Sequence, residues 1–122
     1  MPNLLVMVLN KPEPQNEILQ VFKQIGVKGA TIIESMGMGR ARAENQVTPL
    51  VAGLMRALDT GHHYNRTIFC VIEDDAVLAR AVEEADRLVD FSHPGSGIIF
   101  AIPVSLVRGM DTVKSVREKA SR

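Results

Sequence analysis

The sequence has little of what marks several functional classes. Among 122 residues there is one cysteine, Cys70, with no tryptophan, one tyrosine and four phenylalanines. A single cysteine excludes an internal disulfide, so a reducing, cytoplasmic location is the expectation. The few aromatic rings argue against the stacking platforms of single-strand nucleic-acid binders. With 14 basic and 14 acidic residues, the chain also lacks the overall basic charge of a nucleic-acid-binding protein.

Long apolar runs are missing as well. The first run, residues 4–9, is too short for a signal-peptide core or a membrane span, and no basic residue precedes it. The length predicts one domain, residues 1–122, that buries about two thirds of its unfolded surface. A net charge of zero favours association, which fits an oligomer.

The apolar pattern alternates between continuous runs, which predict strands, and helical spacing. Pro12 and Pro14 suit the first turn of a helix and Gly26 suits its end. Glu73-Asp74-Asp75 is interpreted as a helix start rather than as an acid–base pair. The predicted elements are a strand at 4–9, a helix over 18–25, strands at 30–36 and 67–72, a helix over 77–89 and a strand at 98–102.

The order β-α-β-β-α-β is that of the ferredoxin-like α+β fold. We therefore expect a four-stranded antiparallel sheet with two helices on one face. Because the strands are apolar at consecutive positions, the uncovered face is expected to bury itself against another subunit. A polar tail, about residues 110–122, follows the last strand.

A long insertion, about residues 40–65, separates the two middle strands. Hairpin loops usually have two to five residues, and much longer ones tend to be functional or disordered. Thr48 as an N-cap, Pro49 at the first helical position and leucines at every fourth position from 50 to 58 predict a short amphipathic helix inside it.

Two glycine turns are candidate ligand contacts. Gly37-Met38-Gly39-Arg40 opens the insertion, and Gly95-Ser96-Gly97 precedes the last strand. Backbone N–H groups in such turns could cradle a phosphate, and the guanidinium of Arg40 matches an oxyanion. The alternative is that the glycines only supply the positive φ that turns require.

The ordered set of short motifs resembles that of the PII-like signalling proteins. The resemblance runs from Leu4 to about Val107 and includes Asn10-Lys11-Pro12, Gly26-Val27-Lys28-Gly29-Ala30-Thr31, Ile72-Glu73-Asp74-Asp75 and both glycine turns. It implies a non-enzymatic homotrimer that binds an adenine-type nucleotide or another small effector between subunits. It further implies that the insertion, called the T-loop in that family, regulates a protein target such as a transporter or a metabolic enzyme.

The resemblance also implies site residues. They are Leu9 and Thr31 near the adenine, Gly37, Met38, Gly39 and Arg40 at the T-loop base, Gly95, Ser96 and Gly97 on the phosphate side, and Arg108 from a neighbouring subunit. The chain has Ile98 where the family usually has a lysine, and it lacks the usual arginine pair after the last strand. The effector is therefore left open among ATP, ADP, AMP and a cyclic nucleotide, with no permanently bound cofactor.

Two rival interpretations remain open. His62 and His63 suggest the CutA-like proteins, which share the fold and the trimer and are linked to divalent metals, but adjacent histidines do not easily bind one ion, so no metal site is predicted. The other rival is a structural trimer whose loop helix is an interaction surface. No nucleophile–base pair is visible from the spacing, so no catalytic mechanism is argued.

Overall fold

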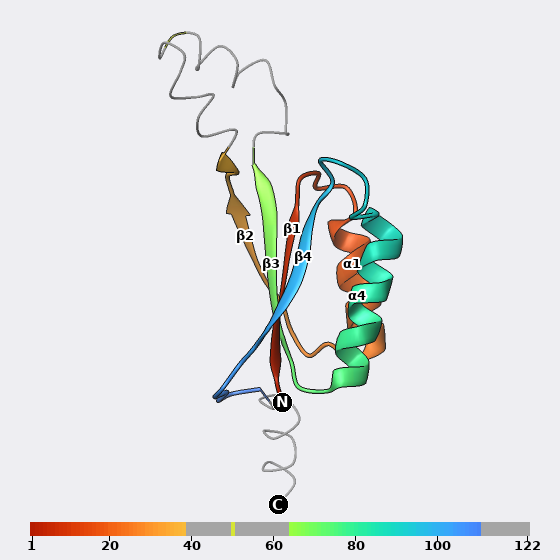
Figure 1. Cartoon of the computed structure of the whole chain (residues 1–122), viewed down its shortest axis with the longest axis vertical. Coiled ribbons are helices and arrows are strands. Elements are labelled where there is room, and N and C mark those ends of the chain that lie inside the picture. The colour runs from red at the N-terminus through yellow and green to blue at the C-terminus, as the bar shows by residue number, and fades with distance from the viewer. Residues whose placement is uncertain (39–49, 51–63, 111–122) are drawn as a thin grey trace, which may run out of the picture.

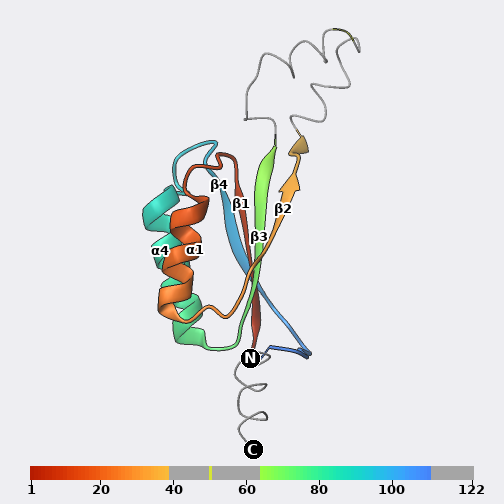
Figure 2. The same cartoon turned by 180° about the vertical axis from the view of Figure 1, so that it is seen from behind.

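The computed structural model of the chain describes residues 1–38, 50 and 64–110. These residues form one sheet with two helices on one face (Figures 1 and 2). The elements are β1 (Asn3–Leu9), α1 (Gln15–Ile25), β2 (Thr31–Ser35), β3 (Asn65–Ile72), α4 (Asp75–Val89) and β4 (Gly97–Pro103). The strand order is β2-β3-β1-β4, and all neighbours are antiparallel. The predicted ferredoxin-like α+β fold is confirmed.

The helix ends follow the local chemistry that the sequence predicts. α1 ends at Gly26, whose φ of 106° is left-handed, and the next N–H, that of Val27, donates to the carbonyl of Phe22. α4 begins after Asp74, whose Oδ1 accepts hydrogen bonds from the N–H groups of Ala76 (2.8 Å) and Val77 (3.4 Å). The acidic run is therefore a helix cap, as interpreted.

The hydrophobic core lies between the sheet and the helices. Its buried members are Leu5, Met7 and Leu9 from β1, Ile68, Cys70 and Ile72 from β3, Ile18 and Phe22 from α1, and Ala81 and Ala85 from α4. Burial raises the pKa of the Cys70 thiol to about 11, so the thiol stays protonated and packs as a small apolar group.

The opposite sheet face, called the open face below, has no helix over it in the part of the chain that the structure describes (Figure 2). Strand alternation and register place on it Thr31, Ile33 and Ser35 of β2, Thr67, Phe69 and Val71 of β3, Leu4, Val6 and Val8 of β1, and Ile98, Phe100 and Ile102 of β4. Ile33, Ile98, Phe100 and Ile102 are 44–55% exposed. The open face is apolar, as the sequence predicts.

Three expected features lie outside the described residues. They are the short helix of the insertion, apart from the single residue Leu50, the histidines His62 and His63, and the tail beyond Met110. Gly39 and Arg40, at the start of the insertion, also lie there. The corresponding expectations stay predictions.

Candidate functional site

The strand directions place the two glycine turns at the same end of the sheet, the upper end in Figure 1. The cross-strand register aligns Glu34, Arg66, Leu9 and Gly97 in one row across all four strands. Because β2 and β4 are the outer strands, Gly37 and Gly97 lie near opposite edges. Three strand spacings of about 4.8 Å separate those edges, or about 14 Å. One chain alone therefore keeps the two turns apart.

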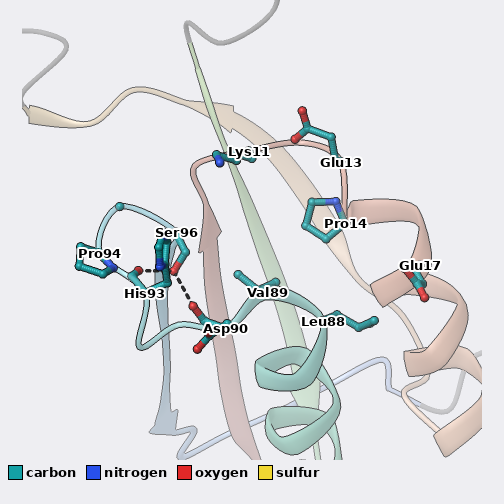
Figure 3. A pocket seen from close by; sticks show the side chains of 11 residues that line it. Lys11, Glu13, Pro14, Glu17, Leu88, Val89, Asp90, His93, Pro94 and Ser96 are labelled. Atoms are coloured by element: carbon teal, nitrogen blue, oxygen red, sulfur yellow. Dashed lines mark hydrogen bonds between the residues drawn. The ribbon is translucent and has the colours of Figure 1, made fainter.

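The turn before β4 is held by its own hydrogen bonds. The Ser96 hydroxyl lies 2.9 Å from the carbonyl oxygen of Asp90 and 2.8 Å from that of His93, as Figure 3 shows. The side-chain amide of Asn10 donates to the carbonyl of Gly95 at 2.7 Å, and the backbone N–H of Asn10 donates to that of Ser96 at 3.2 Å. The backbone N–H of Ser96 also donates to the carbonyl of His93, at 3.2 Å. Both the hydroxyl hydrogen and the N–H of Ser96 are thus used within the turn, whereas the lone pairs of the hydroxyl can accept from a ligand.

Gly95 and Gly97 have structural reasons to be glycine. Both have positive φ, 83° and 142°. A Cβ on Gly97 would lie 2.1 Å from the carbonyl oxygen of Val8, whereas a Cβ on Gly95 would meet nothing within 4 Å. Gly97 is therefore required by the close approach of β4 to β1, and Gly95 by its backbone conformation.

A pocket of about 600 Å³ lies beside this turn on the helix side (Figure 3). Its walls come from the segment before α1, including Lys11 and Glu13, from the first turn of α1, from the end of α4, and from His93 and Pro94 of the turn. The carboxylates of Glu13, Glu17 and Asp90 outnumber the one lysine of the lining, so this pocket disfavours an anionic ligand.

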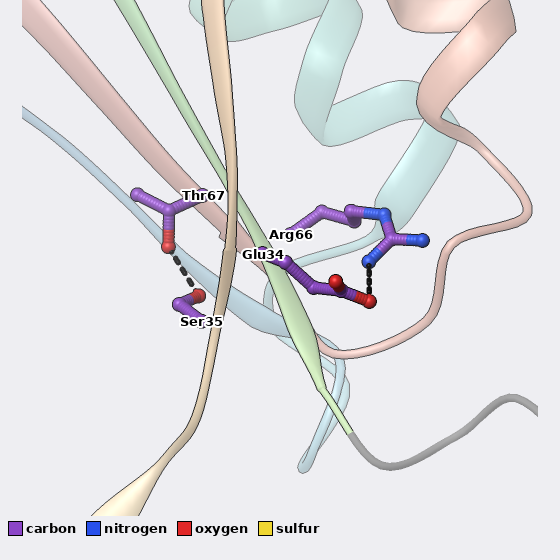
Figure 4. Close-up of polar contacts among 4 residues, drawn as sticks. All are labelled: Glu34, Ser35, Arg66 and Thr67. Carbon is purple, nitrogen blue, oxygen red and sulfur yellow. Dashed lines mark hydrogen bonds and ion pairs between the residues drawn. The ribbon is translucent and has the colours of Figure 1, made fainter.

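The Gly37 corner follows the last residues of β2. A Cβ on Gly37 would lie 3.4 Å from the side-chain nitrogen of Asn65, at the start of β3. Met38, the next residue, is 77% exposed. Just before the corner, β2 and β3 are joined by two side-chain pairs, an ion pair between Glu34 and Arg66 and a hydrogen bond between Ser35 and Thr67 (Figure 4).

Sequence reasoning missed Arg66 and Asn10. Arg66 precedes an apolar strand and belongs to no motif, so only the β2–β3 register shows that it faces Glu34. Asn10 was used for the resemblance, but its role in fastening the turn at Gly95 depends on β1 and β4 being neighbours.

Thr31 and Leu9, both expected near the adenine, lie on opposite faces of the sheet. Thr31 lines a pocket of about 400 Å³ on the open face, with apolar walls from Leu4, Phe69 and Val71. Residues 28–30, 109 and 110 complete this pocket, called the Thr31 pocket below. The Leu9 side chain is 1% exposed and belongs to the core, so in one chain a ligand could reach only its backbone.

Arg108 lies away from the glycine turns. It belongs to the exposed segment that follows β4, at the lower end of the sheet in Figure 1, where the N–H of Val104 donates to the carbonyl of Pro2. Within one protomer, Arg108 and the Gly95 turn are thus at opposite ends of β4. The expectation that Arg108 serves the site of a neighbouring subunit stays a prediction.

The described part of the chain contains neither a cluster of metal ligands nor a membrane-spanning helix. Among residues 1–38, 50 and 64–110, no three His, Cys, Asp or Glu side chains gather to hold a metal ion. None of the helices in these ranges combines the length and the apolar character that crossing a bilayer requires.

Comparison with known proteins matches the chain to one family over most of its length. Residues 4–114 match the family model described as "Nitrogen regulatory protein P-II". A nitrogen regulatory protein P-II of Azospirillum brasilense is 28% identical over 97 residues, which cover 80% of this chain and 81% of the relative. The range that the family model matches takes in both glycine turns and the insertion between β2 and β3.

Proposed function

Because this chain belongs to the P-II family of nitrogen regulatory proteins, we propose that it is a cytoplasmic signal-transduction protein that works as a homotrimer. An adenine-type nucleotide binds in clefts between its subunits, and the insertion between β2 and β3 regulates a protein partner. The observation that carries this proposal is the placement of the two glycine turns at one end of the sheet but at opposite edges.

The open face supports assembly. Ile33 at one edge and Ile98, Phe100 and Ile102 at the other are each about half exposed. Burying a large apolar side chain completely stabilises by about 1.5–3 kcal/mol, so completing the burial of each of these contributes about 1 kcal/mol. A net charge of zero offers no overall repulsion between copies.

An interface between two copies supplies what one chain lacks. If the β2 edge of one protomer lies beside the β4 edge of the next, the Gly37 corner and the Gly95 turn face the same cleft. The backbone N–H groups of Gly37 and Gly95 suit phosphate oxygens. The Thr31 pocket lies at the β2 edge too, at the opposite end of β2 from the Gly37 corner, and its volume of about 400 Å³ is within the range of small-molecule sites. Its apolar walls suit a flat base.

Calorimetry with ATP, ADP, AMP and a cyclic dinucleotide tests the proposal, together with the mass of the protein in solution. We expect a trimer that binds at least one of these ligands. Gly37→Leu is the informative variant, because its Cβ would lie 3.4 Å from the movable Asn65 amide and the larger side chain would occupy the corner. It should keep the trimer and the melting temperature while losing nucleotide binding.

The rivals give different results in the same experiments. If none of these nucleotides binds at millimolar concentration, the proposal is rejected. Zinc or copper binding that weakens in His62→Ala and His63→Ala would favour a CutA-like metal-binding protein. Partner binding that is unaffected by nucleotide and by Gly37→Leu would favour a structural trimer.

A further inference from the structure

The loop root is defined here as residues 34–37 and 65–67, where the two arms of the insertion leave the sheet. Arg66 Nη1 donates to Glu34 Oε1 at 2.9 Å, and the hydroxyls of Ser35 and Thr67 are 2.7 Å apart. Glu34 is directly opposite Arg66, and Ser35 is opposite Asn65, which is the last pair of β2 and β3. The two contacts therefore close the end of the hairpin.

The two contacts lie on opposite faces of the sheet. Arg66 shares its row with Leu9, whose side chain faces the helices, so the ion pair is on the helix face. Thr67 precedes the core residue Ile68 in β3, so its side chain is on the open face. The register of β2 and β3 places Ser35 on the same face. With one contact on each face, the last residues of β2 and β3 are joined on both sides of the sheet. Gly37 follows Ser35 after one residue, and a Cβ on it would lie 3.4 Å from the side-chain nitrogen of Asn65.

We propose that Glu34 and Arg66 are positioning residues for the Gly37 corner. Their ion pair holds the last residues of β2 and β3 together and so keeps the backbone of the corner in the shape that an anionic effector meets. This inference rests on the proposed function, because it assigns the residues that prepare one half of the proposed site. Neither residue is among the expected ligand contacts.

The position of Arg66 on the helix face indicates that it acts through the backbone rather than by binding the effector. Its guanidinium lies on the helix face, whereas the Thr31 pocket opens on the other face. Glu34 already occupies one arm of the guanidinium. The side chains of Arg66 and Glu34 are 31% and 61% exposed, so the pair is too exposed to act as an anchor of the fold.

The direction in which two substitutions change nucleotide affinity distinguishes a positioning role from a purely electrostatic one. Glu34→Gln removes a negative charge and Arg66→Gln removes a positive one. If only the electric field mattered, the first would tighten binding of an anionic nucleotide and the second would weaken it. Positioning predicts that both weaken it, by about two- to fivefold, the range expected from losing an exposed ion pair. The double variant Glu34→Arg/Arg66→Glu restores the pair and should bind within about twofold of the original chain.

Glu84→Gln is the matched control, because Glu84 forms an ion pair with Arg87 at 2.7 Å on the surface of α4, away from the loop root. It should leave nucleotide affinity unchanged. The experiment measures calorimetric affinity for the nucleotide that binds most tightly, and amide hydrogen exchange of residues 34–38 and 64–67 in the free trimer. We expect exchange there to be faster in Glu34→Gln and Arg66→Gln than in Glu84→Gln.

The positioning role is overturned if Glu34→Gln binds as tightly as the original chain or more tightly. It is also overturned if the charge-exchanged double variant stays as weak as Arg66→Gln. If the original chain binds no nucleotide, the proposed function fails. Hydrogen exchange then tests whether the ion pair holds the backbone of the corner. Equal exchange in Glu34→Gln and Glu84→Gln would reject it, and faster exchange in Glu34→Gln would keep the ion pair as the support of the corner.

Discussion

The two glycine turns of this protein are built in opposite ways. The turn before β4 is fastened by bonds from Ser96 and from Asn10, and Gly97 leaves no room for a side chain beside Val8. The Gly37 corner is held by two cross-strand pairs just before it, and a Cβ at Gly37 would lie 3.4 Å from the side-chain nitrogen of Asn65. The Gly95 turn is thus held by its own hydrogen bonds and by close packing against β1, whereas the Gly37 corner depends on two side-chain pairs of the neighbouring strands.

In the Gly95 turn, the largest loss of stability is expected from a substitution at Gly97. In Gly97→Ala the new Cβ would overlap the carbonyl oxygen of Val8 at a backbone φ that disfavours side chains. Overpacking and backbone strain together should destabilise by about 3 kcal/mol or more. The measurement is the free energy of unfolding in urea. Gly29→Ala is the control, because a Cβ there meets nothing within 4 Å, and an equal loss in both variants would contradict this account.

A smaller loss of stability in the same turn is expected from Asn10→Ala. It removes the 2.7 Å bond from the Asn10 side chain to the carbonyl of Gly95 and leaves the backbone bond to Ser96. We expect a loss of about 1 kcal/mol in unfolding free energy. Asn3→Ala is the matched control, since its side-chain amide donates to the carbonyl of Met1, two residues away. If Asn10→Ala costs no more than Asn3→Ala, the turn does not depend on this fastening.

The open-face half of the loop root is tested with Ser35→Ala and Thr67→Val, singly and together. Their hydroxyls share one hydrogen bond across β2 and β3, so the two losses should not add. A coupling energy of about 0.5–1 kcal/mol in a double-mutant cycle is expected for such a cross-strand pair. Additive losses would show that the bond contributes nothing and that the corner is held by the ion pair alone.

The smallest effect on stability is expected at the ion pair itself. Glu34→Gln should lower the free energy of unfolding by about 0.2–1 kcal/mol, because both side chains are partly exposed and screened by salt. The effect should shrink further in 1 M salt, which chemical denaturation in low and high salt can measure. A loss of unfolding free energy comparable to that of Gly97→Ala would mean that the ion pair stabilises the corner as much as close packing stabilises the Gly95 turn, and the contrast between the turns would disappear.

Most of the fold could be predicted from the sequence, because its signals are local. Gly26 ends α1 and Asp74 caps α4 through contacts within a few residues. The site could be predicted only in part, because its contacts join distant segments. Asn10 and Gly95 are 85 residues apart, and Glu34 and Arg66 are 32 apart, so no spacing pattern could reveal them. Alternation and register put the side chains of Thr31 and Leu9 on different faces of one chain, so their expected place near the adenine of a site between subunits stays a prediction.

The order of strands and helices, the helix caps and the apolar character of both sheet faces follow from the sequence alone, since each depends on hydrophobic periodicity and on turn chemistry within a few residues. That β2 and β4 are the outer strands, and hence that the two glycine turns lie at opposite edges of the sheet, is known from the three-dimensional arrangement. The same holds for the pairing of Glu34 with Arg66. The physical reason is that strand order and register are set by the packing of the whole sheet against its helices, which residues near one another in the sequence do not encode.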